Sequence, residues 1–210
     1  MTDRLVVLLL GASVAQAAPP GCDGVALAAA MAEDVLAVFS ELDGIDEAIA
    51  FRDPAGAELA RSIAWPGTAL IELAAAASPA DLLCAVAERG YRQAAIVAPD
   101  APDLPALHLA KAFSALGSAA AAVALAVNGG VVIVASRLPA SADLDDFDLD
   151  VFDLDGFQRS GAAAPDRSLP AGVRQTLPWH RLRRPADLAL LDPGLEGWEA
   201  TRGLLSGHRP

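Results

Sequence analysis

Short apolar runs alternate with longer amphipathic stretches along much of the chain. Residues 5–10 and 94–98 are continuously apolar, which is typical of strands buried on both faces of a sheet. A further strand is expected at residues 47–52. Helices are expected at residues 25–42, 57–61, 78–89, 104–116, 185–191 and 195–205. Strands that alternate with helices in this way predict an α/β fold with a largely parallel sheet, in which segments 5–10 and 94–98 are neighbouring central strands.

A hairpin is expected in the middle of the chain. The β-rich runs Val123–Val127 and Val131–Ala135 flank Asn128-Gly129-Gly130, and Asn-Gly between apolar runs favours a tight turn. The sheet is therefore predicted to be mixed, with an antiparallel edge. Beyond Arg137, residues 139–176 are rich in Pro, Ala, Asp and Gly and predict long loops.

The first residues have some features of a secretory signal peptide. An apolar run at residues 5–10 precedes Ala15-Gln16-Ala17, a small-x-small pattern. However, Asp3 cancels the charge of Arg4, and six apolar residues are few for a signal sequence. A first β-strand and a cytoplasmic location are expected instead. No apolar run approaches the roughly 20 residues of a membrane span.

Length and composition suit one domain, assigned to residues 1–192, with a helical appendage at 193–210. Of the 210 residues, 54% are hydrophobic, and the formal net charge is -12. Such an acidic balance disfavours nucleic acid or an anionic membrane as partner. The two cysteines, Cys22 and Cys84, lie far apart in the sequence, so a structural zinc site is not expected.

The most informative segment runs from Ala94 to Pro105. Its apolar strand ends at Pro99 and delivers Asp100 and Asp103 just beyond its C-terminal end, where open α/β sheets usually bind ligands and metals. Asp103 has an alternative explanation as the N-cap of the helix beginning near residue 104. Asp100 has no such alternative.

Several segments, in the same order, resemble the bacterial nucleotidyltransferase-like proteins of the glycosyltransferase-A (GT-A) superfamily, often described as radical-SAM-associated transferases. The loop Ala98–Pro105 is similar to the family's Gly-Ser/Ala-Asp-x-Pro-Asp-Leu-Pro motif, and Leu177–Leu188 is similar to its Leu-Pro-Trp-His segment. The other matching segments are Arg4–Leu8, Met31–Leu36 and Asn128–Val134. The resemblance implies a three-layer α/β/α nucleotide-diphospho-sugar transferase-like (GT-A) fold with a mixed, mostly parallel sheet.

The chain also departs from that family. Residues 11–23 contain no Lys or Arg, although a basic phosphate-binding loop is expected there, and Gly67–Leu73 replaces a Gly-Asp-Leu-Gly-Glu-Arg element. Asn128 occupies the position of the acidic residue in the family's hairpin motif. Arg181 and Arg183 occupy the positions of two acidic residues that follow the Trp-His pair in the family and that help hold a divalent metal in related enzymes. Mg²⁺ therefore keeps one candidate ligand, Asp100, whereas a metal ion usually needs several oxygen donors. No other cofactor is indicated.

Two explanations for these arginines remain open. Arg181 or Arg183 could occupy the space of the lost cation and neutralise Asp100, or could bind a phosphate without metal. Alternatively, both belong to a solvated surface cluster. If the first explanation holds, Asp100 should lie within salt-bridge reach of Arg181 or Arg183.

Two functional hypotheses follow. The first is a divergent nucleotidyltransferase- or glycosyltransferase-like protein that binds a nucleotide or phosphorylated ligand at the C-terminal edge of the strands, with a reduced catalytic apparatus. The second is a non-catalytic binding or scaffold protein that retains the fold. The candidate catalytic residues are Asp100 and Asp103. The candidate substrate-binding residues are Gly11, Ala12, Ser13, Asn128, Gly129, Gly130, Arg137, His180, Arg181 and Arg183.

Seven aspartates gather between Asp143 and Asp155. An EF-hand loop would need an acid at Val151 and a glutamate at Ala162, so the segment fails that pattern. We interpret it as an acidic loop or an exposed edge strand rather than a metal site.

Overall fold

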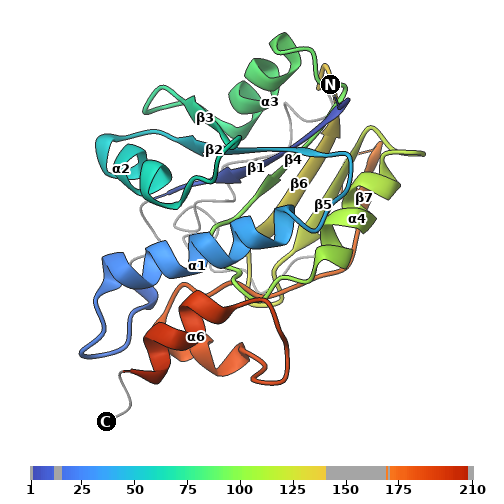
Figure 1. Cartoon of the computed structure of the whole chain (residues 1–210). Coiled ribbons are helices and arrows are strands. Elements are labelled where there is room, and N and C mark those ends of the chain that lie inside the picture. The colour runs from blue at the N-terminus through green and yellow to red at the C-terminus, as the bar shows by residue number, and fades with distance from the viewer. Residues whose placement is uncertain (1, 12–15, 141–168, 170, 208–210) are drawn as a thin grey trace.

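One mixed sheet organises the part of the chain that the structure describes, residues 2–11, 16–140, 169 and 171–207 (Figure 1). The structure is a computed structural model. Seven strands of the described residues run in the spatial order β3-β2-β1-β4-β6-β5-β7. Their bounds are β1 (Arg4–Leu9), β2 (Asp46–Phe51), β3 (Ala69–Glu72), β4 (Gln93–Val97), β5 (Ala121–Leu125), β6 (Val131–Arg137) and β7 (Val173–Gln175).

Helices cover both faces of this sheet. The helices of the described residues are α1 (Gly24–Phe39), α2 (Pro54–Ile63), α3 (Pro79–Glu88), α4 (Ala106–Ala115), the 3₁₀ helix η4 (Pro185–Leu190) and α6 (Glu199–Ser206), of which α1 to α4 cover the sheet. Buried side chains of α1, α2 and α4 pack against one face, and those of α3 pack against the other. The three-layer α/β/α arrangement is therefore confirmed.

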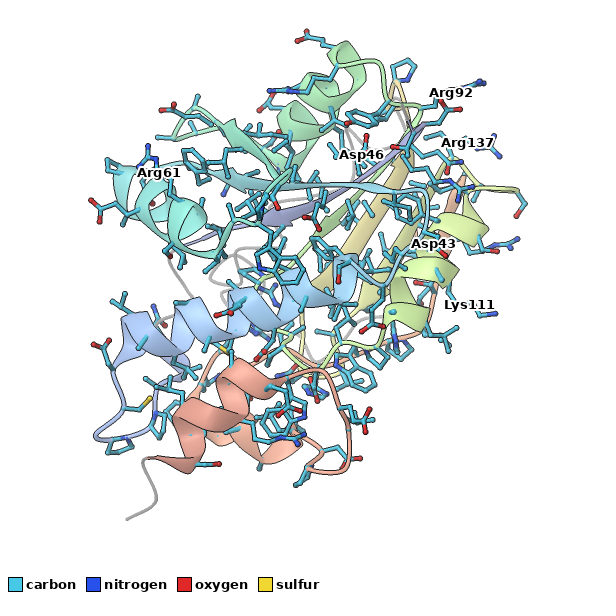
Figure 2. All side chains as sticks on the ribbon, in the orientation of Figure 1. Asp43, Asp46, Arg61, Arg92, Lys111 and Arg137 are labelled. Atoms are coloured by element: carbon cyan, nitrogen blue, oxygen red, sulfur yellow. The ribbon has the colours of Figure 1, made fainter. Side chains whose placement is uncertain are left out.

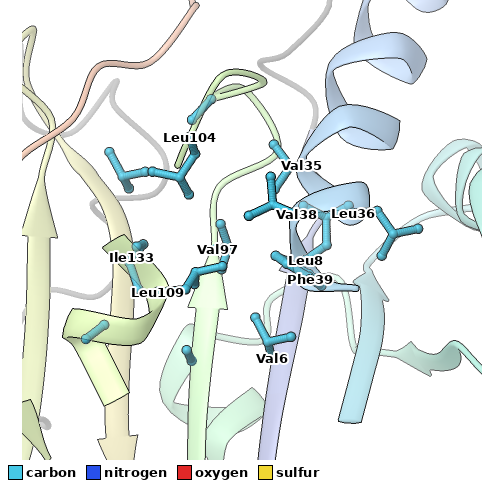
Figure 3. Close-up of a cluster of buried hydrophobic side chains, with 14 of the residues drawn as sticks. Val6, Leu8, Val35, Leu36, Val38, Phe39, Val97, Leu104, Leu109 and Ile133 are labelled. Atoms are coloured by element: carbon cyan, nitrogen blue, oxygen red, sulfur yellow. The ribbon is translucent and has the colours of Figure 1, made fainter. Parts of the chain in front are cut away.

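The two apolar runs form the centre of the sheet. β1 pairs in parallel with β4, with Leu5 opposite Ala94 and Leu8 opposite Val97, as predicted. Alternate residues of β1 point to opposite faces, so both faces of this strand are buried. Figure 3 shows one of these faces, where Leu8 and Val97 meet Val35 and Leu36 of α1. Continuous apolar character thus reflects burial on two sides.

The predicted hairpin is present, but the expectation of an antiparallel edge was wrong. β5 and β6 pair antiparallel around the turn at Asn128–Gly130, and Gly129 and Gly130 both have positive φ, as such a turn requires. β6 lies between β4 and β5, inside the sheet. The edges are the short strands β3 and β7, each pairing in parallel with its neighbour.

The pairing of β6 with β4 decides which loops meet. Because β6 runs antiparallel to β4, its beginning lies beside the end of β4, and the amide of Ala98 donates to the carbonyl of Val132 at 2.9 Å. The hairpin turn therefore lies at the same edge as the Asp100 loop. The segment after β7 reaches this edge as well, because the amide of Val127 donates to the carbonyl of Trp179 at 2.7 Å.

The C-terminal helix packs on the first long helix (Figure 1). Leu204 and Leu205 of α6 pack with Leu27 and Met31 of α1. Asp34, buried in α1, accepts hydrogen bonds from the amides of Ala200 (2.9 Å) and Thr201 (2.8 Å) in the first turn of α6. A carboxylate at a helix N-terminus satisfies amides that have no partner within the helix.

No helix among the described residues is long and apolar enough to cross a membrane.

Replacing Asp34 with alanine should destabilise the protein. The amides of Ala200 and Thr201 would lose their buried acceptor, and we expect the free energy of unfolding to fall by about 1–3 kcal/mol. Urea denaturation followed by circular dichroism measures this. Glu33→Ala is the matched control, because Glu33 is the exposed neighbour on the same helix. Equal effects of the two substitutions would contradict the role assigned to Asp34.

The same residue predicts a pH dependence. Burial raises the pKa of Asp34 above its ordinary value, although hydrogen bonds from Thr201 and Ala200 oppose the shift. A carboxyl group whose pKa is raised on folding stabilises most below its unfolded pKa and loses that contribution as pH rises through its folded pKa. The free energy of unfolding of the native protein relative to Asp34→Asn should therefore decline from acidic to neutral pH. A relative stability that increases over this interval would contradict the raised pKa.

Candidate functional site

The Asp100 loop begins directly after β4 and is buried. The side chain of Asp100 is 0% exposed. Its backbone carbonyl accepts a hydrogen bond from the amide of Leu182 at 2.7 Å, so the Asp100 loop and the segment after Trp179 lie side by side. This contact joins residues more than eighty positions apart and brings the arginines to the aspartate.

Arg181 forms a two-point ion pair with Asp100. Its Nε donates to Oδ1 at 2.6 Å, and its Nη2 donates to Oδ2 at 2.9 Å. Nη1 donates to the carbonyl of Val131 at 3.1 Å. The arginine is only 1% exposed, so both charges are withdrawn from water. The expected salt bridge at Asp100 is thus confirmed, and it is Arg181 that forms it.

Asn128 holds the backbone of Arg181 in register with the hairpin turn. Its side-chain Nδ2 donates to the carbonyl of Arg181 at 2.6 Å, and its Oδ1 accepts from the amide of Arg181 at 3.1 Å. The side-chain amide of Asn128 can both donate to the carbonyl and accept from the N–H of the same residue. A carboxylate at this position could only accept, because it has no donor. Asn128 therefore acts here as a positioning residue for Arg181.

Arg183 lies beside Arg181 but has no carboxylate partner among the described residues. Its Nη2 donates to the carbonyls of Asn128 (2.6 Å) and Gly129 (2.7 Å). Its Nε is buried without a hydrogen-bond partner in the described part of the chain. Burial first, and then the charge of Arg181, lower the pKa of Arg183 to about 10, against the opposing effect of Asp100 and Asp187.

Asp103 belongs to a second group of contacts, formed with aromatic rings. Its Oδ1 accepts a hydrogen bond from Trp179 Nε1 at 3.1 Å. His180 Nε2 lies 2.9 Å from the same oxygen, although its ring N–H is not aligned for a hydrogen bond. Trp179 stacks on His180 and meets His108 edge to face. Burial lowers the pKa of His108, which favours the neutral ring.

Asp103 is not the N-cap of α4, so that explanation was wrong. The N-cap position is Pro105, which provides no side-chain hydrogen bond. The indole of Trp179 competes successfully for the carboxylate, because Asp103 is nearly fully buried and needs a donor there.

The residues at Asp100 do not fit a divalent metal ion. Both carboxylate oxygens of Asp100 already accept hydrogen bonds from Arg181, and a guanidinium would repel a cation. Among the described residues, no group of three His, Cys, Asp or Glu side chains could hold a metal. The described residues at Asp100 therefore do not form the ligand set of the metal-dependent chemistry that the sequence resemblance implies.

The other predicted site residues divide into three groups. Gly130 is part of the hairpin turn, and Gly11 is exposed just after β1 at the same edge of the sheet. Ala12 and Ser13 lie outside the described residues, as does the acidic segment at 143–155. Arg137 lies far from the others, at the opposite end of β6. Figure 2 shows it beside Arg92, near the beginning of β1.

Three participants were missed by the sequence analysis. The carbonyl of Val131 accepts from Arg181, His108 contacts Trp179, and Asp187 accepts from the amides of Arg183 (3.0 Å) and Arg184 (2.9 Å). Asp187 is the third residue of η4, three positions after the N-cap residue Arg184, and an acid at this position of a helix that begins with Pro185 is a capping signal that could have revealed it. The carbonyl of Val131 could not have been found in this way, because every residue carries a backbone carbonyl and the sequence does not show which one is used.

The strand order and the helices on both faces define an α/β protein with a nucleotide-diphospho-sugar transferase-like fold. The chain belongs to the DUF2064 family, described as an uncharacterized protein conserved in bacteria, whose family model matches residues 35–150. The resemblance stated from the sequence is thereby confirmed. No curated protein matches the chain.

Solved structures share this fold over nearly the whole chain. A protein assigned as a nucleotide-diphospho-sugar transferase from Desulfovibrio desulfuricans G20 is 15% identical, with 99% of each chain covered and a TM-score of 0.63. A 4-diphosphocytidyl-2C-methyl-D-erythritol synthase is 12% identical, with 98% of this chain and 99% of that chain covered and a TM-score of 0.55. CMP:2-keto-3-deoxy-manno-octonic acid synthetase, complexed with CTP, is 11% identical with the same coverage and a TM-score of 0.52.

Breaking the Asp100–Arg181 pair on one side should be strongly destabilising. Arg181→Met leaves a buried carboxylate and the Val131 carbonyl without donors, so we expect a loss of about 3–5 kcal/mol in the free energy of unfolding. The double variant Asp100→Leu/Arg181→Met should regain much of this loss, because no buried charge remains. Urea denaturation measures both. Arg184→Met, at an exposed position, is the control, and an Arg181→Met variant as stable as this control would contradict the buried ion pair.

Proposed function

We propose that this protein binds a nucleotide or another phosphorylated ligand at the C-terminal edge of its sheet and does not catalyse metal-dependent transfer. One observation carries the proposal: both oxygens of Asp100 are bound by the guanidinium of Arg181 inside the protein. The carboxylate that the family resemblance would assign to a metal is thus neutralised by the chain itself.

The absence of transfer chemistry follows from this pairing. Metal ions stabilise the charge that develops on phosphoryl oxygens during transfer. A buried guanidinium that already donates to Asp100 and Val131 has few donors left for a substrate. Oδ1 of Asp103 accepts from Trp179 and lies against His180, and no group of three His, Cys, Asp or Glu among the described residues could hold a metal with it.

Ligand binding is supported by the position of the loops. Open α/β sheets bind ligands at the carboxyl ends of their strands, and the Asp100 loop, the hairpin turn and the Arg181–Arg183 segment all meet there. One protein of the same fold is complexed with CTP. Gly129 and Gly130 carry no side chains at the turn, so a ligand can approach the backbone closely.

A scaffold function is the second candidate. The full burial of Asp100 and Arg181 favours it, because neither side chain is presented to solvent. In that case the ion pair is purely structural and the edge of the sheet serves another purpose. The two candidates differ in a single measurable property, the binding of phosphorylated small molecules.

Isothermal titration calorimetry with CTP and UDP-glucose tests the proposal. We expect binding that is no tighter with Mg²⁺ than with EDTA, because the described part of the chain offers no group of side chains that could hold the ion. We also expect no pyrophosphate or UDP release during long incubation with sugar phosphates, measured by chromatography.

Asp100→Asn is the informative variant in this experiment, and Asp187→Asn is its comparison. Metal-dependent binding that Asp100→Asn abolishes would contradict the proposal, since Asp100 would then be a metal ligand. Failure of the native protein to bind CTP, UDP-glucose or pyrophosphate under any condition would reject ligand binding and favour the scaffold.

A further inference from the structure

The charges around Arg183 do not balance among the described residues. Two described carboxylates, Asp100 and Asp187, act on Arg183 together with two other arginines, Arg181 and Arg184. Both carboxylate oxygens of Asp100 accept hydrogen bonds from Arg181. Asp187 accepts from the backbone amides of residues 183 and 184 rather than from a guanidinium. Among the described residues, one positive charge is therefore left without a carboxylate partner.

That charge lies on Arg183, which is more than nine-tenths buried. Its hydrogen bonds go to two neutral carbonyls, those of Asn128 and Gly129. Its Nε is buried without a partner, and its Nη1 donates no hydrogen bond to any described residue. A buried charge without a counter-charge is costly, and structures normally provide one.

Its environment also keeps Arg183 in a fixed position. The two carbonyls belong to the turn between β5 and β6, and the amide of Arg183 is fixed by Asp187 at 3.0 Å. A guanidinium held in this way has lost its side-chain entropy before any ligand arrives, which favours binding. Arg184, the next residue, is exposed, and although its amide also donates to Asp187, its guanidinium makes no hydrogen bond to the carbonyls of the turn.

We propose that Arg183 is the receptor for a phosphate group of the ligand and that this phosphate supplies the missing negative charge. The proposal rests on the proposed function and specifies its ligand: a phosphate or diphosphate group free of metal. A planar guanidinium donates to phosphate oxygens directly, so no cation is needed between protein and ligand.

Magnesium should then act as a competitor. In metal-dependent enzymes the ion bridges protein carboxylates and phosphates, and binding needs it. Here Mg²⁺ bound to the ligand would neutralise the charge that Arg183 recognises, and no described carboxylate at the turn could bind the ion in return.

The test is calorimetric titration of the protein with inorganic pyrophosphate at low ionic strength, with EDTA or with Mg²⁺. The native protein should bind pyrophosphate more tightly in EDTA. Arg183→Gln should weaken that binding by roughly tenfold or more, because a charge-assisted hydrogen bond is lost. Arg184→Gln removes the same formal charge from the adjacent exposed position and should change the affinity by less than about threefold.

Two further measurements distinguish a specific loss of binding from misfolding of the Arg183→Gln variant. Arg183→Lys keeps the charge without the planar group, and its affinity should fall between those of the native protein and Arg183→Gln. In the native protein, the ¹H–¹⁵N resonance of the Arg183 Nε group should shift on addition of pyrophosphate. Acetate is the control anion and should cause no comparable shift.

Each outcome separates the two proposals. If CTP and pyrophosphate bind but Arg183→Gln binds them as the native protein does, the assignment of Arg183 is overturned and the proposed function stands. Tighter binding with Mg²⁺, or acetate bound as tightly as pyrophosphate, also overturns it. If the native protein binds none of the phosphorylated probes, the proposed function fails and the Arg183 proposal fails with it.

Discussion

The ion pair between Asp100 and Arg181 is the interaction on which the C-terminal edge of the sheet depends. Two charges that are 0% and 1% exposed are tolerable inside a protein only when their geometry is close to ideal. That requirement is met by two parallel hydrogen bonds, by the Val131 carbonyl on the remaining side of the guanidinium, and by the amide of Asn128 on the backbone. Three separate segments must therefore hold their positions together.

The same arrangement explains why the departures from the family pattern occur as a set. An arginine at position 181 would be repelled by a metal ion at Asp100, and an acid at position 128 could not donate to the carbonyl of Arg181 as the Asn128 amide does. Asp100, Asn128 and Arg181 therefore depend on one another, since each supplies a hydrogen-bond partner that another of them needs. Arg183 is the member of the set whose charge the described residues do not compensate, in a protein whose net charge is -12.

Local signals in the sequence predicted the fold well. The apolar runs at β1 and β4 and the Asn-Gly turn are determined by neighbouring residues, and all three were found where expected. β3 and β7 were missed because they are short and mostly exposed. They owe their strand conformation to pairing with β2 and β5, which a local pattern does not contain.

The candidate site could be predicted only in part. Asp100, Asn128 and Arg181 meet as expected because the family resemblance places all three at one edge. Arg137 was assigned to that edge wrongly. It follows the turn by seven strand residues, which at about 3.3 Å per residue spans roughly 20 Å. The position of β6 inside the sheet, and the contact of Asp103 with Trp179, arise from long-range packing and could not be inferred from spacing.

The distance in sequence between Asp100 and its counter-charge has a consequence for the order of events during synthesis. The two residues are 81 positions apart, and a ribosome adding about 5–20 residues per second needs roughly 4–16 seconds to cover that interval. During this time β1, β2 and β4 exist while the carboxylate at the end of β4 has no partner. The ion pair at this edge can therefore form only after the segment around Arg181 has emerged, so that closure of the interior there depends on a segment made long after the central strands.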